Sequence, residues 1–286
     1  MDNTQYLQIL NKFIKSALQE DVGDGDHSTL SCIDESAKGK AILKIKDTGI
    51  IAGIDVAEKI FHFIEKEAHL KFYKKDGEHV QPGDIAFEVQ ASIHTILTAE
   101  RLVLNCMQRM SGIATLTNIY VTEIKNYHSK LLDTRKTTPN FRLLEKEAVK
   151  IGGGYNHRFG LYDMIMLKDN HIDYCGGIEK ALNKAWNYVE NKKPRLKIEI
   201  ETRNLKEVKE AVSTGKADRI MLDNFKPAEI VEALKIINHS CETEASGGIT
   251  LKNIQSYAAT GVDFISSGAI IHQAQSLDLS LKAEIN

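Results

Sequence analysis

The first half of the chain mixes strand-like and helix-like patterns of hydrophobic positions. From residue 38 to about residue 92, KAILKIKDTGIIAGI alternates, VAEKIFHFIEKEA has helical spacing, and HLKFYKKDGEHVQPGDIAFEVQAS returns to strands. The segment IHTILTAERLVLNCMQRMSGIATLTNIYVTEIKNY then predicts a long helix that is broken or bent at Ser111-Gly112. This pattern predicts an α+β unit of roughly a hundred residues, with a domain boundary inside the long helix.

The second half has a regular rhythm of short apolar runs separated by helix-like segments. The runs are KLLD (130–133), MIML (164–167), LKIEI (196–200), RIML (219–222), CETEA (241–245, the weakest) and VDFIS (262–266). Alternating strands and helices predict parallel strands that are joined by right-handed crossovers and buried on both faces. Six such units could close into a small β/α barrel or remain an open, doubly wound sheet.

Polar or glycine-rich clusters follow the runs, at the point where each strand should end. They are Asp133–Lys136, Lys168–His171, Glu199–Glu201, Asp223-Asn224, Ser246–Gly248 and Ser266–Gly268. In a barrel the carboxyl ends of all strands meet on one face, whereas in an open sheet only the two clusters at the switch point would cooperate. We therefore favour an α/β fold with a barrel of about six strands.

The composition narrows the classes of partner. The 286 residues are 42% hydrophobic and 27% charged, with 37 Lys and Arg against 39 Asp and Glu, which does not favour nucleic-acid or anionic-membrane binding. The chain shows neither a leader-like opening nor an apolar run long enough to span a membrane, so we expect a cytoplasmic protein. The four cysteines lack metal or redox spacing and are predicted to be buried free thiols: Cys32, Cys106, Cys175 and Cys241.

Positive charge concentrates between residues 135 and 168, where seven Lys or Arg stand against three acids. Two of these cations, Lys146 and Lys150, fall on the expected solvent face of the helix FRLLEKEAVKI. Arginine binds carboxylate or phosphate groups bidentately, and lysine adds a compact positive charge. The cations at strand ends and in the loop IGGGYNHR therefore predict a site for a ligand with several negative groups: Arg135, Lys136, Arg158 and Lys168, with His157 beside them.

Small residues end the last two strands, and acids end two strands before them. The small residues are Ser246, Gly247, Gly248, Ser267 and Gly268, which would expose backbone N–H groups where barrels commonly bind a phosphate. Glu201 and Asp223 either form buried ion pairs or contact sugar hydroxyls and Mg²⁺, because hard divalent cations take oxygen ligands. The residues alone thus indicate a phosphate cradle, a polyol or metal site, and a cationic pocket.

As a set, these motifs resemble the quinolinate phosphoribosyltransferase family. The matching segments run in order along nearly the whole chain: EDVGDGDHST, ERLVLNCMQRMSGIAT, LDTRKTTP, GGGYNHRFGLYDMIMLKDNHI, EIE, MLDN, EASGGI and VDFISSGAI. The resemblance implies an N-terminal α/β sandwich over residues 1–110, with the tail 274–286 packing on it, and a small TIM-like β/α barrel over residues 111–273. It also implies a homodimer in which the sandwich of one subunit helps to cover the barrel of the other.

The resemblance implies roles for individual residues. The carboxylates of quinolinate would be held by Arg101 from the partner subunit and by Arg135, His157, Arg158 and Lys168. Phosphoribosyl pyrophosphate would be held by Lys136, Glu201, Asp223, Ser246, Gly247, Gly248, Ser267 and Gly268, of which Lys136, Glu201 and Asp223 would be catalytic. The expected cofactor is Mg²⁺, bound mainly through the pyrophosphate, with no site made by the protein alone.

The chain departs from the family pattern at two points. Asn140 stands where the family commonly has glycine, and asparagine tolerates similar backbone angles, so we expect no loss of function. The interval from Glu201 to Asp223 is one residue longer than usual, and we expect the extra residue to lie in the turn near Thr214-Gly215-Lys216. If the turn does not accommodate it, Glu199 would take the place of Glu201.

The reaction that the resemblance implies is attack of the pyridine nitrogen of quinolinate on C1′ of the sugar, followed by loss of the 2-carboxylate as CO₂. The product would be nicotinate mononucleotide, made in the de novo synthesis of NAD. His157 could act as a general acid or only as a fixed donor. Two alternatives remain open: a related phosphoribosyltransferase with another acceptor such as nicotinate, and a non-catalytic sensor of phosphorylated ligands.

Overall fold

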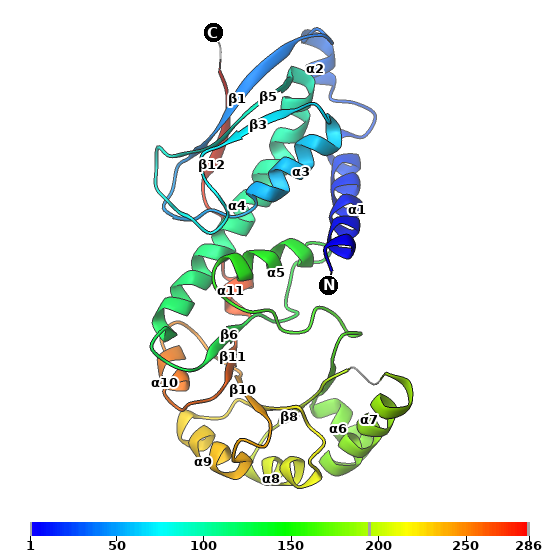
Figure 1. Cartoon of the computed structure of the whole chain (residues 1–286), viewed down its shortest axis with the longest axis vertical. Helices are drawn as coiled ribbons and strands as arrows, with labels where there is room; N and C mark the ends of the chain where they lie inside the picture. The colour runs from blue at the N-terminus through cyan, green and yellow to red at the C-terminus, as the bar shows by residue number, and fades with distance from the viewer. Residues whose placement is uncertain (1, 194–195, 285–286) are drawn as a thin grey trace. The chain divides into compact units, whose positions relative to one another are not determined.

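The computed structural model describes residues 2–193 and 196–284, which group into two compact units (Figure 1). Unit 1 takes the chain up to residue 118, residues 137–153 and the chain from residue 273 onward. Unit 2 takes residues 119–136 and 154–272. The division therefore falls inside the long helix, eight residues beyond the boundary predicted at residue 110. Unit 1 also includes residues 137–153, which lie within the range predicted for the barrel domain.

Unit 1 is built on an antiparallel sheet of four strands. Their order is β12 (Leu279–Glu284), β1 (Lys38–Ile45), β5 (Ile85–Ser92) and β3 (His69–Phe72), beside a small pair of β2 (Gly49–Ile50) with β4 (His79–Val80). The helices are α1 (Asn3–Val22), α2 (His27–Cys32), α3 (Ile54–Ile64), α4 (Ile93–Ile124) and α5 (Arg142–Ile151). Phe61 of α3 and Phe87 of β5 meet edge to face at 6.2 Å, so the helix and the sheet share a core.

The last strand, β12, pairs with β1 along its whole length, from Lys40 opposite Glu284 to Ile45 opposite Leu279. The alternation of apolar and polar positions in LSLKAE fits this pairing, because Leu279 and Leu281 are buried. Residues 285 and 286 of the predicted tail lie outside the described residues.

Helix α4 runs without interruption through Ser111-Gly112, so the predicted break is wrong. Gly112 serves a different purpose. A Cβ atom at this position would overlap the carbonyl oxygen of Gln275, which lies against the helix within unit 1. Glycine is needed here for the close approach of two backbones, which sequence alone cannot distinguish from a helix break.

Unit 2 contains six parallel strands in the order β6 (Lys130–Leu132), β11 (Phe264–Ser266), β10 (Glu242–Ser246), β9 (Arg219–Asp223), β8 (Ile198–Thr202) and β7 (Ile165–Leu167). The connections contain α6 (Asp169–Cys175), α7 (Ile178–Lys192), α8 (Leu205–Thr214), α9 (Pro227–Ile237) and α10 (Ile254–Ala258), and α11 (Ala269–His272) follows β11. From β7 to β11 each strand lies next to its successor, and β6 lies beside β11. The chain therefore winds in one direction without a switch point, which confirms the small β/α barrel over the doubly wound sheet.

Two expectations about burial are wrong. Lys146 is only 1% exposed, because α5 buries an unusually wide face that also includes Glu145. Lys150 is exposed, as predicted, and it forms an ion pair with Glu147. All four cysteines are free, but only Cys106 is fully buried and Cys32 is exposed. The short helix α6 was not predicted, because its polar sequence DNHIDYC lacks an apolar stripe.

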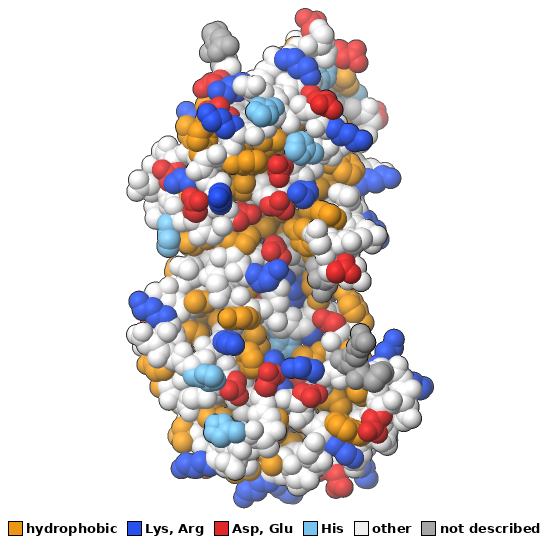
Figure 2. Space-filling model, viewed as in Figure 1, with side chains coloured by type: hydrophobic (Ala, Val, Ile, Leu, Met, Phe, Trp, Pro, Cys, Tyr) orange, Lys and Arg blue, Asp and Glu red, His pale blue; other side chains and the backbone are white. Residues whose placement is uncertain are grey.

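On the face shown in Figure 2, acidic and basic side chains are interspersed, and neither kind forms a large patch. This distribution agrees with the formal net charge of -2. Among the described residues, no helix is both long enough and apolar enough to cross a membrane.

Replacing Gly112 with alanine should destabilise unit 1, although alanine normally favours a helix over glycine. Because the new methyl group would overlap Gln275, we expect the free energy of unfolding to fall by about 1–3 kcal/mol. Asn105→Ala, at an exposed position of the same helix, is the control and should change it by less than about 0.5 kcal/mol. Urea unfolding followed by circular dichroism measures both, and a stabilised Gly112→Ala variant would contradict the close approach.

Candidate active site

The carboxyl ends of β8, β9 and β10 bring polar side chains together because neighbouring parallel strands are in register. Asp223, the last residue of β9, lies opposite Ser246, the last residue of β10, and Glu201 of β8 lies opposite Met221. Side chains alternate along a strand, so Glu199 and Glu201 share one face of β8. The inward face of the barrel is therefore lined by charged groups at two levels.

The upper level contains an acidic pair and a lysine. Partial burial and the nearby carboxylate of Asp223 raise the pKa of Glu201. Lys168 lies at the end of β7 with its Nζ 3.9 Å from Oε2 of Glu201. Two carboxylates that repel each other beside a half-exposed lysine form a site that a cation or several hydroxyl groups would stabilise.

Arg135 and Arg158 lie close enough for their charges to interact. Burial and the neighbouring guanidinium of Arg135 lower the pKa of Arg158. The Nη1 atom of Arg158 donates to the carbonyl of Met164 at 3.1 Å, and Asp163 holds the loop between them by accepting from the backbone N–H of Phe159. Because two half-buried guanidinium groups repel each other, their shared position favours an anion between them.

The loop that carries Arg158 is held against the first barrel strand. Tyr155 N–H donates to Leu131 O at 2.8 Å, and Asp133 N–H donates to Tyr155 O at 3.0 Å. The buried carboxylate of Asp133 then accepts from the N–H of His157 at 2.8 Å. These bonds explain why the motifs LLDTRK and GGGYNHR, which are separated in sequence, supply cations to one place.

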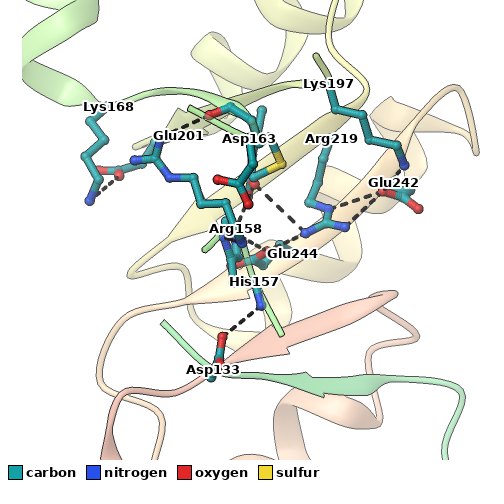
Figure 3. A network of polar contacts seen from close by, with 12 residues as sticks. Asp133, His157, Arg158, Asp163, Lys168, Lys197, Glu201, Arg219, Glu242 and Glu244 are labelled. Atoms are coloured by element: carbon teal, nitrogen blue, oxygen red, sulfur yellow. Dashed lines mark hydrogen bonds and ion pairs between the residues drawn. The ribbon is translucent and has the colours of Figure 1, made fainter. Parts of the chain in front are cut away.

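The lower level is an ion network built around two fully buried carboxylates (Figure 3). His157 Nε2 lies 3.0 Å from Oε2 of Glu199 and 3.4 Å from Oε2 of Glu244, and both carboxylates have no exposed area. Arg219, from the first residue of β9, brings its Nη1 to 3.1 Å from the same oxygen of Glu244 and its Nη2 to 3.0 Å from Glu242. The network thus extends from the amino end of the strands up to His157.

Burial and charge pairing oppose each other in this network. Burial alone would lower the pKa of His157, but Glu199 and Glu244 outweigh it and raise the pKa to about 9. Burial, reinforced by Glu244, raises the pKa of Glu199 to about 7. Burial acts in the same direction on Glu244, yet His157 and Arg219 hold its pKa below the ordinary value. Charge pairing with the two carboxylates therefore outweighs the cost of burying the imidazole.

Glycines follow β10 and β11, and of Gly247, Gly248 and Gly268 only Gly248 borders open space. Gly247 and Gly248 have φ of 94° and 62°, a region that L side chains rarely adopt. A Cβ atom at Gly247 would overlap Asn224, whereas one at Gly248 would meet nothing within 4 Å. A Cβ atom at Gly268 would lie 3.1 Å from Cδ of Lys136, so this lysine reaches the second small-residue loop.

The structure brings together the predicted site residues that lie in unit 2, although Ser267 is buried and donates its hydroxyl to Ile249 O at 3.0 Å. Arg101 is exposed on α4 and belongs to unit 1. Sequence analysis missed Glu244 as a partner of His157 and Arg219 as a partner of Glu244. The spacing of Glu242, Glu244 and Ser246 on one face of a strand is the signal that could have revealed the first of them.

Comparison with known proteins identifies the family. The models named quinolinate phosphoribosyl transferase, N-terminal domain, and quinolinate phosphoribosyl transferase, C-terminal domain, match residues 26–111 and 113–282. The chain belongs to the quinolinate phosphoribosyltransferase family. This finding confirms the resemblance that the motifs carry.

Relatives of the family match along the whole length of the chain. Quinolinate phosphoribosyltransferase (decarboxylating) 1b of Nicotiana tabacum is 42% identical over 290 residues, which cover 96% of this chain and 82% of that protein. A probable nicotinate-nucleotide pyrophosphorylase (carboxylating) of Bacillus subtilis is 40% identical and covers 100% of this chain and 96% of that protein. The crystal structure of NadC from Streptococcus pyogenes matches with a TM-score of 0.90 at 39% identity, covering 99% and 97% of the two chains.

The structure shows a residue in the left-handed conformation at Asn140 and in the turn near Gly215. Asn140 has a φ of 62°, the left-handed conformation that glycine commonly provides and asparagine tolerates. Helix α8 ends at Thr214, and Gly215 closes it in the left-handed conformation with φ of 61°. Glu201 lies beside Asp223 and Lys168, whereas Glu199 is engaged below with His157, so the geometry favours Glu201 at the upper level.

Removing the arginine at the base of the network should be strongly destabilising. Arg219→Met leaves the buried carboxylate of Glu244 without its cation, and we expect the free energy of unfolding to fall by about 3 kcal/mol or more. Lys197→Met is the matched control, because Lys197 is 61% exposed and also pairs with Glu242, at 3.6 Å. Exposed pairs contribute about 0–1 kcal/mol, so equal losses in urea unfolding would contradict this account.

Proposed function

We propose that this protein is a decarboxylating quinolinate phosphoribosyltransferase. It transfers the phosphoribosyl group of phosphoribosyl pyrophosphate to quinolinate and gives nicotinate mononucleotide, CO₂ and pyrophosphate, a step in the de novo synthesis of NAD. The observation that carries the proposal is that the carboxyl ends of the barrel strands supply both a pair of interacting cations, Arg135 and Arg158, and an acidic pair, Glu201 and Asp223. A dicarboxylate suits the first pair and a phosphorylated sugar suits the second.

The cationic side of the site would hold quinolinate. Arg135 and Arg158 would each take carboxylate oxygens and thereby relieve their mutual repulsion, while Lys168 would add a third positive charge. We propose that Arg101 completes the grip from the partner subunit of a homodimer. Its exposed position on α4 supports this role.

The other side would hold phosphoribosyl pyrophosphate. Glu201 and Asp223 would accept hydrogen bonds from the ribose hydroxyls, and Lys136 would lie near the leaving pyrophosphate. The open loop at Gly247 and Gly248 would bind the 5′-phosphate through backbone N–H groups. Ser246, Ser267 and Gly268 would shape the same cradle.

The residues fit a magnesium ion that is bound mainly by the substrate. Glu201 and Asp223 are oxygen donors whose repulsion raises the pKa of Glu201, and a divalent cation would relieve that repulsion. When bound, Mg²⁺ would neutralise negative charge on the pyrophosphate. The described trio of buried candidate metal ligands, His157, Glu199 and Glu244, lies below the site and already faces Arg219.

The chain's own residues would act by orientation and electrostatics. The lone pair of the pyridine nitrogen forms the bond to C1′, and the electrons of the C1′–O bond leave with pyrophosphate. The carboxylates of Glu201 and Asp223 would stabilise positive charge that develops on the ribose, and Lys136 would stabilise the leaving group. The bond between C2 and its carboxylate then breaks, its electrons stay at C2 beside the charged nitrogen, and a proton replaces CO₂.

We also propose a cytoplasmic location, which the four free cysteines support because disulfides are rare in a reducing compartment. No role in binding nucleic acid or membranes is proposed. The partners are the two small-molecule substrates and a second copy of the chain.

The direct test is to incubate the purified protein with quinolinate, phosphoribosyl pyrophosphate and Mg²⁺ and to follow the release of CO₂. We expect release that requires all three, and little or no product when nicotinate replaces quinolinate. An omission of phosphoribosyl pyrophosphate controls for spontaneous decarboxylation. Conversion of nicotinate without CO₂ release from quinolinate would overturn the proposed acceptor, and tight binding without any conversion would indicate a sensor.

Substitutions of the adjacent cations Arg135 and Lys136 should change different kinetic constants. Arg135→Ala removes a carboxylate partner, so the KM for quinolinate should rise about 30-fold, equivalent to about 2 kcal/mol, with a smaller change in kcat. Lys136→Ala should lower kcat about 100-fold, because its partner develops charge in the transition state. Steady-state kinetics measures both, Lys150→Ala on the exposed face of α5 is the control, and identical effects would reduce the doublet to a general positive patch.

A further inference from the structure

Both ring nitrogens of His157 are directed at protein groups. On one side Nε2 lies 3.0 Å from Glu199 and 3.4 Å from Glu244. On the other side Nδ1 accepts the backbone N–H of Arg158 at 2.8 Å. The side chain is only 5% exposed, so the imidazole is a buried link between the two carboxylates and the backbone of Arg158 (Figure 3).

The link constrains where the proton of the ring lies. A nitrogen that accepts a hydrogen bond carries no proton, so the bond from Arg158 requires an unprotonated Nδ1. The two carboxylates favour a proton on Nε2, which faces them. The hydrogen bond from Arg158 therefore disfavours the cationic form of the ring, which the carboxylates favour. The carboxylates in turn determine that Nδ1 is the nitrogen that accepts.

The surroundings of the ring hold it from every side. The carboxylate of Asp133, from the end of β6, accepts the backbone N–H of His157, and Arg219 of β9 balances the charge of Glu244. Arg158 itself is affected by the charges of Arg135, Glu199 and Asp163. A metal ion on the trio His157, Glu199 and Glu244 would have to displace this arrangement, because Nη1 of Arg219 lies 3.1 Å and 3.9 Å from the carboxylate oxygens that face the histidine.

We propose that Glu199 and Glu244 are positioning residues for the substrate-carboxylate site, acting on Arg158 through the ring of His157. The carboxylates orient the ring through Nε2, the ring anchors the backbone N–H of Arg158 through Nδ1, and the anchored residue directs its guanidinium beside Arg135. The inference rests on the proposed function and differs from direct contact between His157 and quinolinate, the role that the family resemblance implies. In the proposed arrangement His157 donates nothing to the substrate.

The matched pair Glu244→Gln and Glu242→Gln separates positioning from general loss of charge. Both residues lie on one face of β10 and both pair with Arg219, at 3.1 Å and 3.0 Å, but only Glu244 reaches His157. We expect Glu244→Gln to raise the KM for quinolinate about tenfold with the KM for phosphoribosyl pyrophosphate unchanged, and Glu242→Gln to change neither by more than about twofold. Equal effects of the two variants, or a parallel rise in both KM values, would overturn the proposal.

Spectroscopy tests the link without relying on activity. In histidine-selective ¹⁵N NMR, the imidazole signals of His157 should shift in Glu244→Gln and stay in place in Glu242→Gln. Hydrogen exchange should show a protected Arg158 amide in the wild-type protein and a faster one in Glu244→Gln. A rapidly exchanging Arg158 amide in the wild type, or unshifted imidazole signals in a folded Glu244→Gln protein, would refute the link.

Two further arms keep the outcomes distinct. If Glu244→Gln does not fold, Glu199→Gln tests the same link, because Glu199 lies 3.0 Å from Nε2 of His157. Glu199 is also farther from Arg219 than Glu244 is, at 3.9 Å against 3.1 Å. If the wild-type protein releases no CO₂ from quinolinate, the proposed function fails, while the NMR and exchange measurements still decide the link. A functional enzyme in which His157 contacts the substrate directly would instead show a wild-type imidazole signal that shifts on quinolinate binding and an unprotected Arg158 amide.

Discussion

The rest of unit 2 depends on charge balance inside its six-stranded sheet. Glu199 and Glu244 have no exposed area, and an unpaired buried carboxylate costs several kcal/mol. Their charge is offset by Arg219 and by pairing with His157. Because His157 can approach only if its loop lies against β6, the balance also fixes the segment that carries Arg158. The ion network inside the barrel is thus linked to the position of the loop that carries Arg158.

Sequence analysis succeeded where the information is local. Each barrel strand was predicted from a short apolar run, and the functional residues followed because parallel strands end on one face of the barrel. The weakest prediction, at CETEA, has a physical reason, since Glu242 and Glu244 point inward where a hydrophobic pattern would be expected. The pairing of Glu244 with His157 could not be predicted, because it depends on the register of strands that are far apart in sequence. The prediction that Lys146 is exposed was wrong for a similar reason, because helical spacing alone does not show that both sides of α5 are covered.

The division into units built from separate stretches of the chain also could not be predicted from the order of the elements. Residues 137–153 follow the first barrel strand directly yet belong to unit 1. The reason lies in Glu145 of α5, which receives Nε and Nη2 of Arg109 at 3.0 Å and 2.9 Å and the N–H of Thr138 at 2.8 Å. A buried carboxylate with several donors holds this segment more firmly than its apolar face alone would. The chain that follows Lys136 is therefore anchored in unit 1 through Thr138, and nothing in the local pattern identifies Arg109 as the partner.

The repulsion between Arg135 and Arg158 bears on how the site would discriminate between acceptors. A ligand with two carboxylates can pair both guanidinium groups, whereas a monocarboxylate such as nicotinate leaves one of them partly buried and unpaired. Sites built for polar groups reject analogues that lack them, because the unpaired protein group keeps its desolvation cost. An anchor that holds Arg158 in place increases this cost, since a mobile arginine could turn toward water. Rigid positioning by the buried carboxylates would thus support selectivity as well as affinity, and a loosened Arg158 would lose discrimination against nicotinate along with its grip on quinolinate.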